Sequence, residues 1–115
     1  MSVDAVLQTA LAPFGIPVYP NLYTGTDLEY IVTNYTEISA LYAGDAGHAA
    51  RYLISVRYHL PHKKNPNLTL RQLQRALYNA GCTWPGSVVN ASDELGQIYV
   101  IECEYTDGGA LYGDG

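Results

Sequence analysis

The fold is decided between residues 51 and 81, which read RYLISVRYHL, PHKKNPN and LTLRQLQRALYNAG. In the first block, apolar or aromatic residues occupy every even position from Tyr52 to Leu60, while Ser55, Arg57 and His59 lie between them. A period of two is typical of a β-strand with one buried face and one wet face. We therefore expect this block to form a strand whose even positions face a core.

The third block predicts an amphipathic helix after a polar turn at residues 61–67. We expect Thr69 to cap its N-terminus, with Gln72 completing a capping box and Leu68 packing onto Leu73 across the cap. Gly81 would end the helix in a left-handed conformation. The apolar stripe at helical spacing comprises Leu70, Leu73, Ala76, Leu77 and Ala80.

Further elements are expected on both sides of this unit. Residues 3–14 predict a helix that Ser2 can cap and Gly15 ends. Residues 16–26 are expected to be extended and irregular, and residues 27–41 to form a strand that is covered on both faces or bends through a bulge near Asn34. Residues 84–91 and 97–106 predict a hairpin.

Together these elements predict an α+β fold, with a mainly antiparallel sheet of four to five strands and two helices packed on one of its faces. The chain of 115 residues has the length of one domain, which we place at residues 1–106. Residues 107–115 form a glycine-rich tail that we expect to be flexible.

Composition argues against several classes of protein. With six Lys and Arg residues and a net charge of −5, the chain is poorly suited to bind nucleic acid by neutralising phosphates. No apolar run approaches the ~18 residues of a membrane span, and no basic region precedes the N-terminal apolar residues. We therefore expect synthesis in the cytosol and no membrane association.

Tyrosine dominates the aromatic residues, with eleven tyrosines beside one phenylalanine and one tryptophan. A tyrosine ring tolerates both burial and water, which favours surfaces that become interfaces. The alternative interpretation is a sheet whose β-propensity is supplied by tyrosine.

No pattern of residues indicates a catalytic, cofactor or metal site. Cys82 and Cys103 lack a C-x-x-C partner, so we expect both to be buried thiols. His59 and His62 form H-x-x-H at a strand end with a proline between them, where helical ligand geometry is not available. We therefore expect no enzyme activity, no cofactor and no metal.

In layout, the chain resembles the tail terminator (tail completion, minor tail) proteins of siphophages and prophages. The resemblance covers roughly residues 1–106 and rests on several segments in order. These are an opening helix, IPVYP at residues 16–20, a hairpin around a protruding Gly-Asp loop, the R-x-L-Q-R-A-L-Y-x-A-G helix at 71–81, and a closing hairpin that ends in EYTDG.

The resemblance implies a structural α+β subunit that forms a ring, usually of six, on the last ring of the tail tube. Such a ring ends tube growth and presents a surface to the head connector or stopper protein. DNA would pass through it without specific binding, which the acidic net charge fits. The protein would be made in the host bacterial cytoplasm and reside in the virion tail, at the head-tail interface.

Two kinds of alternative remain at this point. Within phage assembly, the chain could be another head-tail connector, of the stopper or adaptor type, or a tail-tube protein. From a different class, it could be a small ligand-binding or metabolic α+β enzyme with a pocket between the helix at 69–80 and the sheet.

Five residues are candidates for an assembly interface. Asp45 and His48 lie in the glycine-rich loop at 44–48, Arg51 follows that loop, and Leu111 and Tyr112 lie in the tail. Loop and tail contain too few apolar groups to offset the entropy of ordering themselves. We therefore expect both segments to become ordered against neighbouring subunits.

Overall fold

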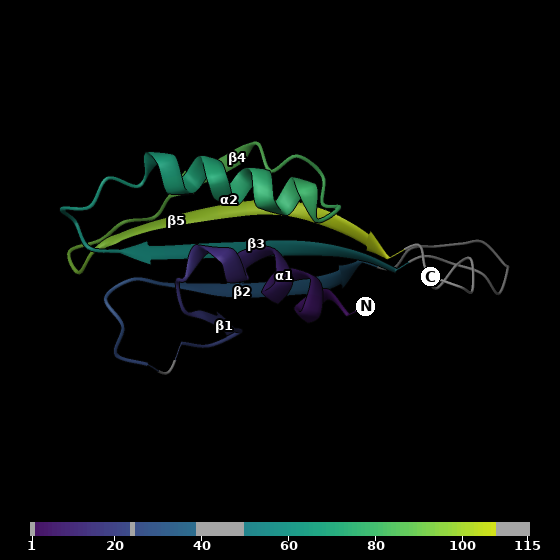
Figure 1. Ribbon diagram of the computed structural model, residues 1–115, viewed down its shortest axis with the longest axis horizontal. Helices are drawn as coiled ribbons and strands as arrows, with labels where there is room; N and C mark the ends of the chain where they lie inside the picture. The colour runs from purple at the N-terminus through teal and green to yellow at the C-terminus, as the bar shows by residue number, and fades with distance from the viewer. Residues whose placement is uncertain (1, 24, 39–49, 108–115) are drawn as a thin grey trace, which may run out of the picture.

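In the computed structural model, which describes residues 2–23, 25–38 and 50–107, the described strands form one sheet with the order β1-β2-β3-β5-β4 (Figure 1). The strands are β1 (Val18–Pro20), β2 (Tyr30–Ile38), β3 (Ala50–Leu60), β4 (Ser87–Asn90) and β5 (Gln97–Asp107). The helices are α1 (Val3–Leu11), the 3-10 turn η1 (Ala12–Phe14) and α2 (Asn67–Asn79). All strand pairs are antiparallel except β1 with β2.

The predicted alternation along β3 is confirmed. The side chains of Ile54, Val56, Tyr58 and Leu60 are almost fully buried, whereas Arg57 is exposed. β3 lies at the centre of the sheet, with β2 on one side and β5 on the other. Its even positions therefore form the floor of the core, and its odd positions point to the opposite face.

Both helices cover the same face of the sheet, as the sequence predicts (Figure 1). The core cluster combines the floor residues of β3 with side chains from the two helices. The helical members are Val3, Leu7, Leu11, Leu70, Leu73 and Leu77. At the start of α1, the Ser2 hydroxyl accepts a hydrogen bond of 3.1 Å from the Ala5 N–H, so the predicted cap is present.

The predicted start of α2 is wrong by two residues. The helix begins at Asn67, and the Asn65 side chain accepts a 2.9 Å hydrogen bond from the Asn67 N–H. Thr69 therefore lies inside the first turn and does not cap the helix. The staple is also wrong, because Leu68 is 69% exposed while Leu73 is buried. Five residues along a helix correspond to a rotation of ~140°, which puts these two leucines on different faces.

The first two strands differ from the prediction in two ways. Residues 18–20, expected to be irregular, form β1, a short parallel edge strand beside β2. A strand of three residues that follows Pro17 and ends in Pro20 is too short for a period of two to be seen. In addition, β2 has no bulge at Asn34, which pairs with Ser55 in an unbroken register. Coverage on both faces holds for its first half, where Ile31, Val32 and Thr33 are all buried.

The closing hairpin is confirmed, although β4 is shorter than predicted. It begins at Ser87 because Pro85 and Gly86 precede it, and the Gln74 side chain donates a 2.7 Å hydrogen bond to the Pro85 carbonyl. Asp107, placed by the sequence in the flexible tail, is the last residue of β5. The remaining tail, residues 108–115, and the loop at 44–48 lie outside the described residues.

We predict that Leu77→Ala lowers the free energy of unfolding by ~2–5 kcal/mol, because it leaves a cavity between α2 and the sheet. Gln72→Ala, on the exposed side of the same helix, is the matched control and should change stability by less than ~0.5 kcal/mol. Urea unfolding followed by circular dichroism measures both. Equal losses for the two variants would contradict the packing of α2.

Candidate functional site

Of the five predicted assembly residues, Arg51 belongs to the described part of the chain. Its guanidinium forms an ion pair of 2.7 Å with Glu104, and both side chains are about 40% exposed, at 44% and 39%. A pair this exposed adds little stability. Asp45, His48, Leu111 and Tyr112 lie outside the described residues, so the predicted loop and tail interface stays a prediction.

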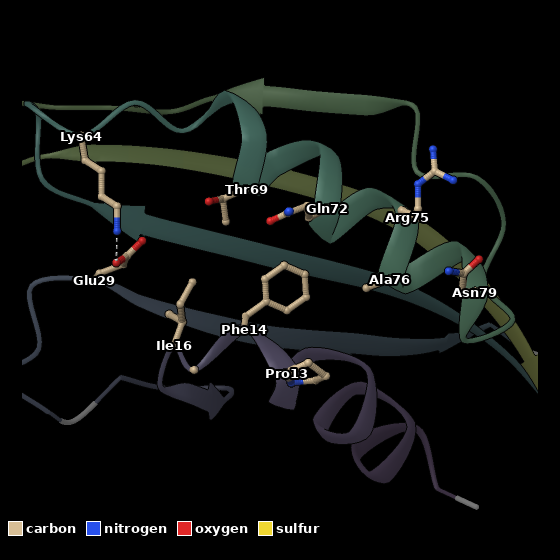
Figure 2. A pocket seen from close by; sticks show the side chains of 11 residues that line it. Pro13, Phe14, Ile16, Glu29, Lys64, Thr69, Gln72, Arg75, Ala76 and Asn79 are labelled. Carbon is tan, nitrogen blue, oxygen red and sulfur yellow. Dashed lines mark hydrogen bonds and ion pairs between the residues drawn. The ribbon is translucent and has the colours of Figure 1, made fainter.

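A groove of about 640 Å³ separates the end of η1 from α2 (Figure 2). The sequence placed a pocket for the enzyme alternative between α2 and the sheet, but the residues that line this groove lie outside the strands. Phe14 and Ile16 line one wall, and Gln72, Ala76 and Asn79 of α2 line the other. The groove has the size of small-molecule sites in general.

A network of polar groups closes one end of this groove (Figure 2). Lys64 donates a 2.7 Å hydrogen bond to one carboxylate oxygen of Glu29. The hydroxyl of the buried Tyr58 donates to the other oxygen, and Thr69 lies close enough to lower the pKa of that hydroxyl. The network joins the start of β2, the end of β3, the turn before α2 and the first turn of α2.

The network holds Glu29 in its charged form and Tyr58 in its neutral form. Burial and the hydrogen bond to Glu29 raise the pKa of the Tyr58 phenol far above its ordinary value. Burial by itself would raise the pKa of Glu29, but the hydrogen bonds from Lys64 and Tyr58 outweigh it and hold that pKa below the usual range. Glu29 thus stays ionised and Tyr58 stays protonated at neutral pH, which suits a structural clamp better than proton transfer.

The two cysteines are buried, as the sequence predicts. Their thiols interact with each other across the core, from Cys82, three residues after the end of α2, to Cys103 in the middle of β5. This contact lowers the pKa of Cys82 and, together with burial, raises the pKa of Cys103. Among the described residues, no cluster of three or more His, Cys, Asp or Glu side chains could hold a metal ion.

The sheet face that the helices leave uncovered, here called the open sheet face, carries an aromatic ladder at one corner. Tyr23 stacks on Tyr30 with 3.6 Å between ring centroids, and Tyr30 stacks on His59 at 4.3 Å. Burial, followed by the nearby Arg57, lowers the pKa of His59. The Tyr19 hydroxyl donates a 2.7 Å hydrogen bond to Asp27, and this fixes the loop between β1 and β2 over the sheet.

The rest of the open sheet face mixes charged and apolar side chains. Residues directly opposite each other in neighbouring strands share a face, so Leu53 and Arg57 of β3 lie with Glu104 and Val100 of β5. Val89 of β4 joins them through its pairing with Val100. Leu53 and Val89 remain 43% and 51% exposed, so part of this face is apolar and uncovered.

A second exposed surface lies on the outer side of α2. It is built by Leu68, Arg71, Arg75 and Tyr78 of the helix, together with Trp84, and we call it the helix patch. Tyr78 and Trp84 pack edge to face, with 5.6 Å between ring centroids, yet each is 54% exposed. A groove of about 420 Å³ runs between Leu68, the two arginines and Trp84. Large exposed apolar groups gathered in one place mark interaction surfaces.

The segment that contains α1 and β2 and the segment that contains α2 carry opposite charges. Residues 2–38 contain the acidic residues Asp4, Asp27, Glu29 and Glu37 and no Lys or Arg. Residues 61–92 contain Lys63, Lys64, Arg71 and Arg75 and no Asp or Glu. The sheet order places β1, β2 and α1 on one side and β4 with α2 on the other, where the β4–β5 hairpin also contributes Asp93, Glu94, Glu102 and Glu104.

The sequence reasoning missed the helix patch and this division of charge. The signal was present, because Leu68, Arg71, Arg75 and Tyr78 recur at helical spacing on the face opposite the core. The contribution of Trp84 could not have been found, since it depends on how the segment after α2 folds back along the helix.

Comparisons with known proteins give the fold and no family. No family model and no curated protein matches the chain. One solved structure without a functional name aligns with 93% of this chain and 96% of its own, with a TM-score of 0.54 and 14% sequence identity. At this identity the likeness concerns the fold alone. In the described part of the chain, no helix has the length and apolar character needed to cross a bilayer.

We predict that Lys64→Met raises the pKa of Glu29, because its strongest charged donor is lost. A carboxyl whose pKa is depressed by folding stabilises the protein above its unfolded pKa, and this contribution is lost as the pH falls through the folded pKa. The acid-unfolding midpoint should therefore move to higher pH. Lys63→Met is the matched control and should leave the midpoint unchanged. A titration of Glu29 by carboxyl NMR that showed no shift would contradict the clamp.

Proposed function

We propose that this protein is a structural subunit of a phage or prophage tail, and that it acts as the tail terminator. In this role it forms a ring, of six subunits, on the last ring of the tail tube. The ring ends tube elongation and offers a joining surface to the head connector. The protein would be made in the host bacterial cytoplasm and would function at the head-tail interface of the virion.

The observation that carries this proposal is the presence of two dissimilar exposed surfaces on one small domain. The helix patch exposes Tyr78 and Trp84 beside two arginines, while the open sheet face exposes Leu53 and Val89 on the other side of the core. A ring subunit needs at least two surfaces for its neighbours and further area for the tube and the connector. The resemblance of the sequence to tail terminators supplies the particular assembly.

Charge supports the same role. The chain has a net charge of −5, and its basic residues are confined to residues 51–75. DNA that moves through a ring should not be held by its wall, and an acidic subunit avoids that attraction. Another connector, of the stopper or adaptor type, or a tail-tube protein would have the same needs, and these roles differ from termination in what the ring does to tube length.

The groove between η1 and α2 favours one candidate from a different class. Its volume of about 640 Å³ and its closed polar end are compatible with a small ligand-binding protein or a metabolic enzyme. The polar groups at that end are already paired with each other, which leaves Gln72, Arg75 and Asn79 on α2 as the side chains that could bind a ligand.

We predict that the purified protein forms rings in negative-stain images, with a mass several times the 12.6 kDa of the monomer. Added to tail tubes during polymerisation, it should stop elongation and appear at one tube end. Bovine serum albumin at equal concentration controls for crowding. A protein that remains monomeric and leaves tube length unchanged would refute termination, whereas rings without an effect on length would favour the connector role.

A further inference from the structure

Resting on the proposed function, we infer that the helix patch is the surface by which one copy of this chain binds a second copy, and that it docks against an acidic patch on the opposite lateral side of its neighbour. The acidic patch consists of Asp4 at the start of α1 together with Tyr35 and Glu37 of β2.

The acidic patch is one continuous surface. The Tyr35 hydroxyl donates a 3.4 Å hydrogen bond to the carboxylate of Asp4, which joins α1 to β2. Glu37 lies two residues further along β2 and on the same face as Tyr35. Asp4 and Glu37 are exposed, and Tyr35 is 39% exposed. The patch thus offers two carboxylates around an accessible ring.

The helix patch is complementary in charge and in shape. Arg71 and Arg75 stand one turn apart on α2, on the same side as Tyr78, and the groove beside Trp84 gives an aromatic ring a place to enter. Lys64 and Glu29, the other charged pair near the helix, neutralise each other within the subunit. The arginines therefore remain the main positive charges on the exposed side of α2.

Because the two patches lie on opposite sides of the subunit, the contact between copies is head to tail. α1 and β2 lie on the β1 side of the sheet, whereas Trp84 and the outer face of α2 lie on the β4 side (Figure 1). Because the two patches differ and lie on opposite sides, each copy can bind one neighbour with each patch. Repetition of such a contact closes a ring when the rotation between copies allows it.

Reversing charge on either patch tests the contact. We expect R71E/R75E and D4K/E37K each to weaken self-association at least ~100-fold, because like charges then face each other. Arg57→Glu, the same change on the open sheet face, is the matched control and should leave the mass unchanged. Because all substituted positions are exposed, we expect the variants to fold, and thermal melts check this. If Asp4→Lys weakens the start of α1, Glu37→Lys by itself tests the acidic patch.

The decisive measurement is the mass of a mixture by analytical ultracentrifugation. In an equal mixture of R71E/R75E and D4K/E37K, every contact between unlike subunits regains opposite charges, so the mass of the wild-type assembly should return. An R71E/R75E variant that assembles like the wild type, or a mixture that fails to recover, would overturn the inference while leaving the ring itself intact.

Two further outcomes separate this inference from the proposed function. If R71E/R75E assembles normally but no longer binds tail tubes, then the occupant of the helix patch is the tube protein and the inference is wrong. If the wild type stays monomeric at every concentration but still caps tubes, self-docking fails and termination stands. A wild type that neither self-associates nor caps tubes would contradict both the docking inference and the proposed function.

Discussion

The even-numbered side chains of β3 lie beneath two helices, while the backbone of the same strand is hydrogen-bonded on both sides. These two constraints together determine where the other elements lie. The side chains of Ile54, Val56 and Tyr58 are fully buried between the sheet and the helices. A slip of one residue in β3 would expose all of them and bury Arg57. The register of β2 and β5, and hence the composition of both sheet faces, follows from this strand.

Tyr58 links this core to the polar network at the end of the groove. Its ring is part of the core, and its hydroxyl reaches Glu29, which Lys64 also holds. A carboxylate this close to the core is stable because both of its oxygens are hydrogen-bonded. The network therefore fixes the turn before α2 relative to β2, and this sets the side of the molecule on which the helix patch faces outward.

The two exposed surfaces are a consequence of the same arrangement. A five-stranded sheet with both helices on one face leaves most of its other face uncovered within the described chain, apart from the corner beside the β1–β2 loop. A helix with a narrow apolar stripe leaves its outer side exposed. Exposed aromatic and apolar residues on a small acidic domain are better explained by neighbours than by chemistry. The proposed ring uses the lateral sides for its own subunits and leaves the open sheet face for other proteins.

By itself, the sequence determined which segments are strands and helices wherever a local period was long enough to be seen. The alternation from Tyr52 to Leu60 and the stripe through Leu73 and Leu77 follow from hydrophobic patterning, which needs no partner. The burial of the two cysteines was expected because they lack a C-x-x-C partner. The start of α2 was misplaced because Thr69 is a good capping residue, whereas the helix begins after Pro66 without a side-chain cap, and Asn65 instead holds the turn before it. The tertiary structure alone decided the rest, since strand order, the pairing of β1 and the contact of Trp84 with Tyr78 depend on segments distant in sequence. Of the candidate surfaces, the helical part of the helix patch was visible in the sequence as a periodic stripe, whereas the contribution of Trp84 and the open sheet face depend on strand order and on the segment after α2.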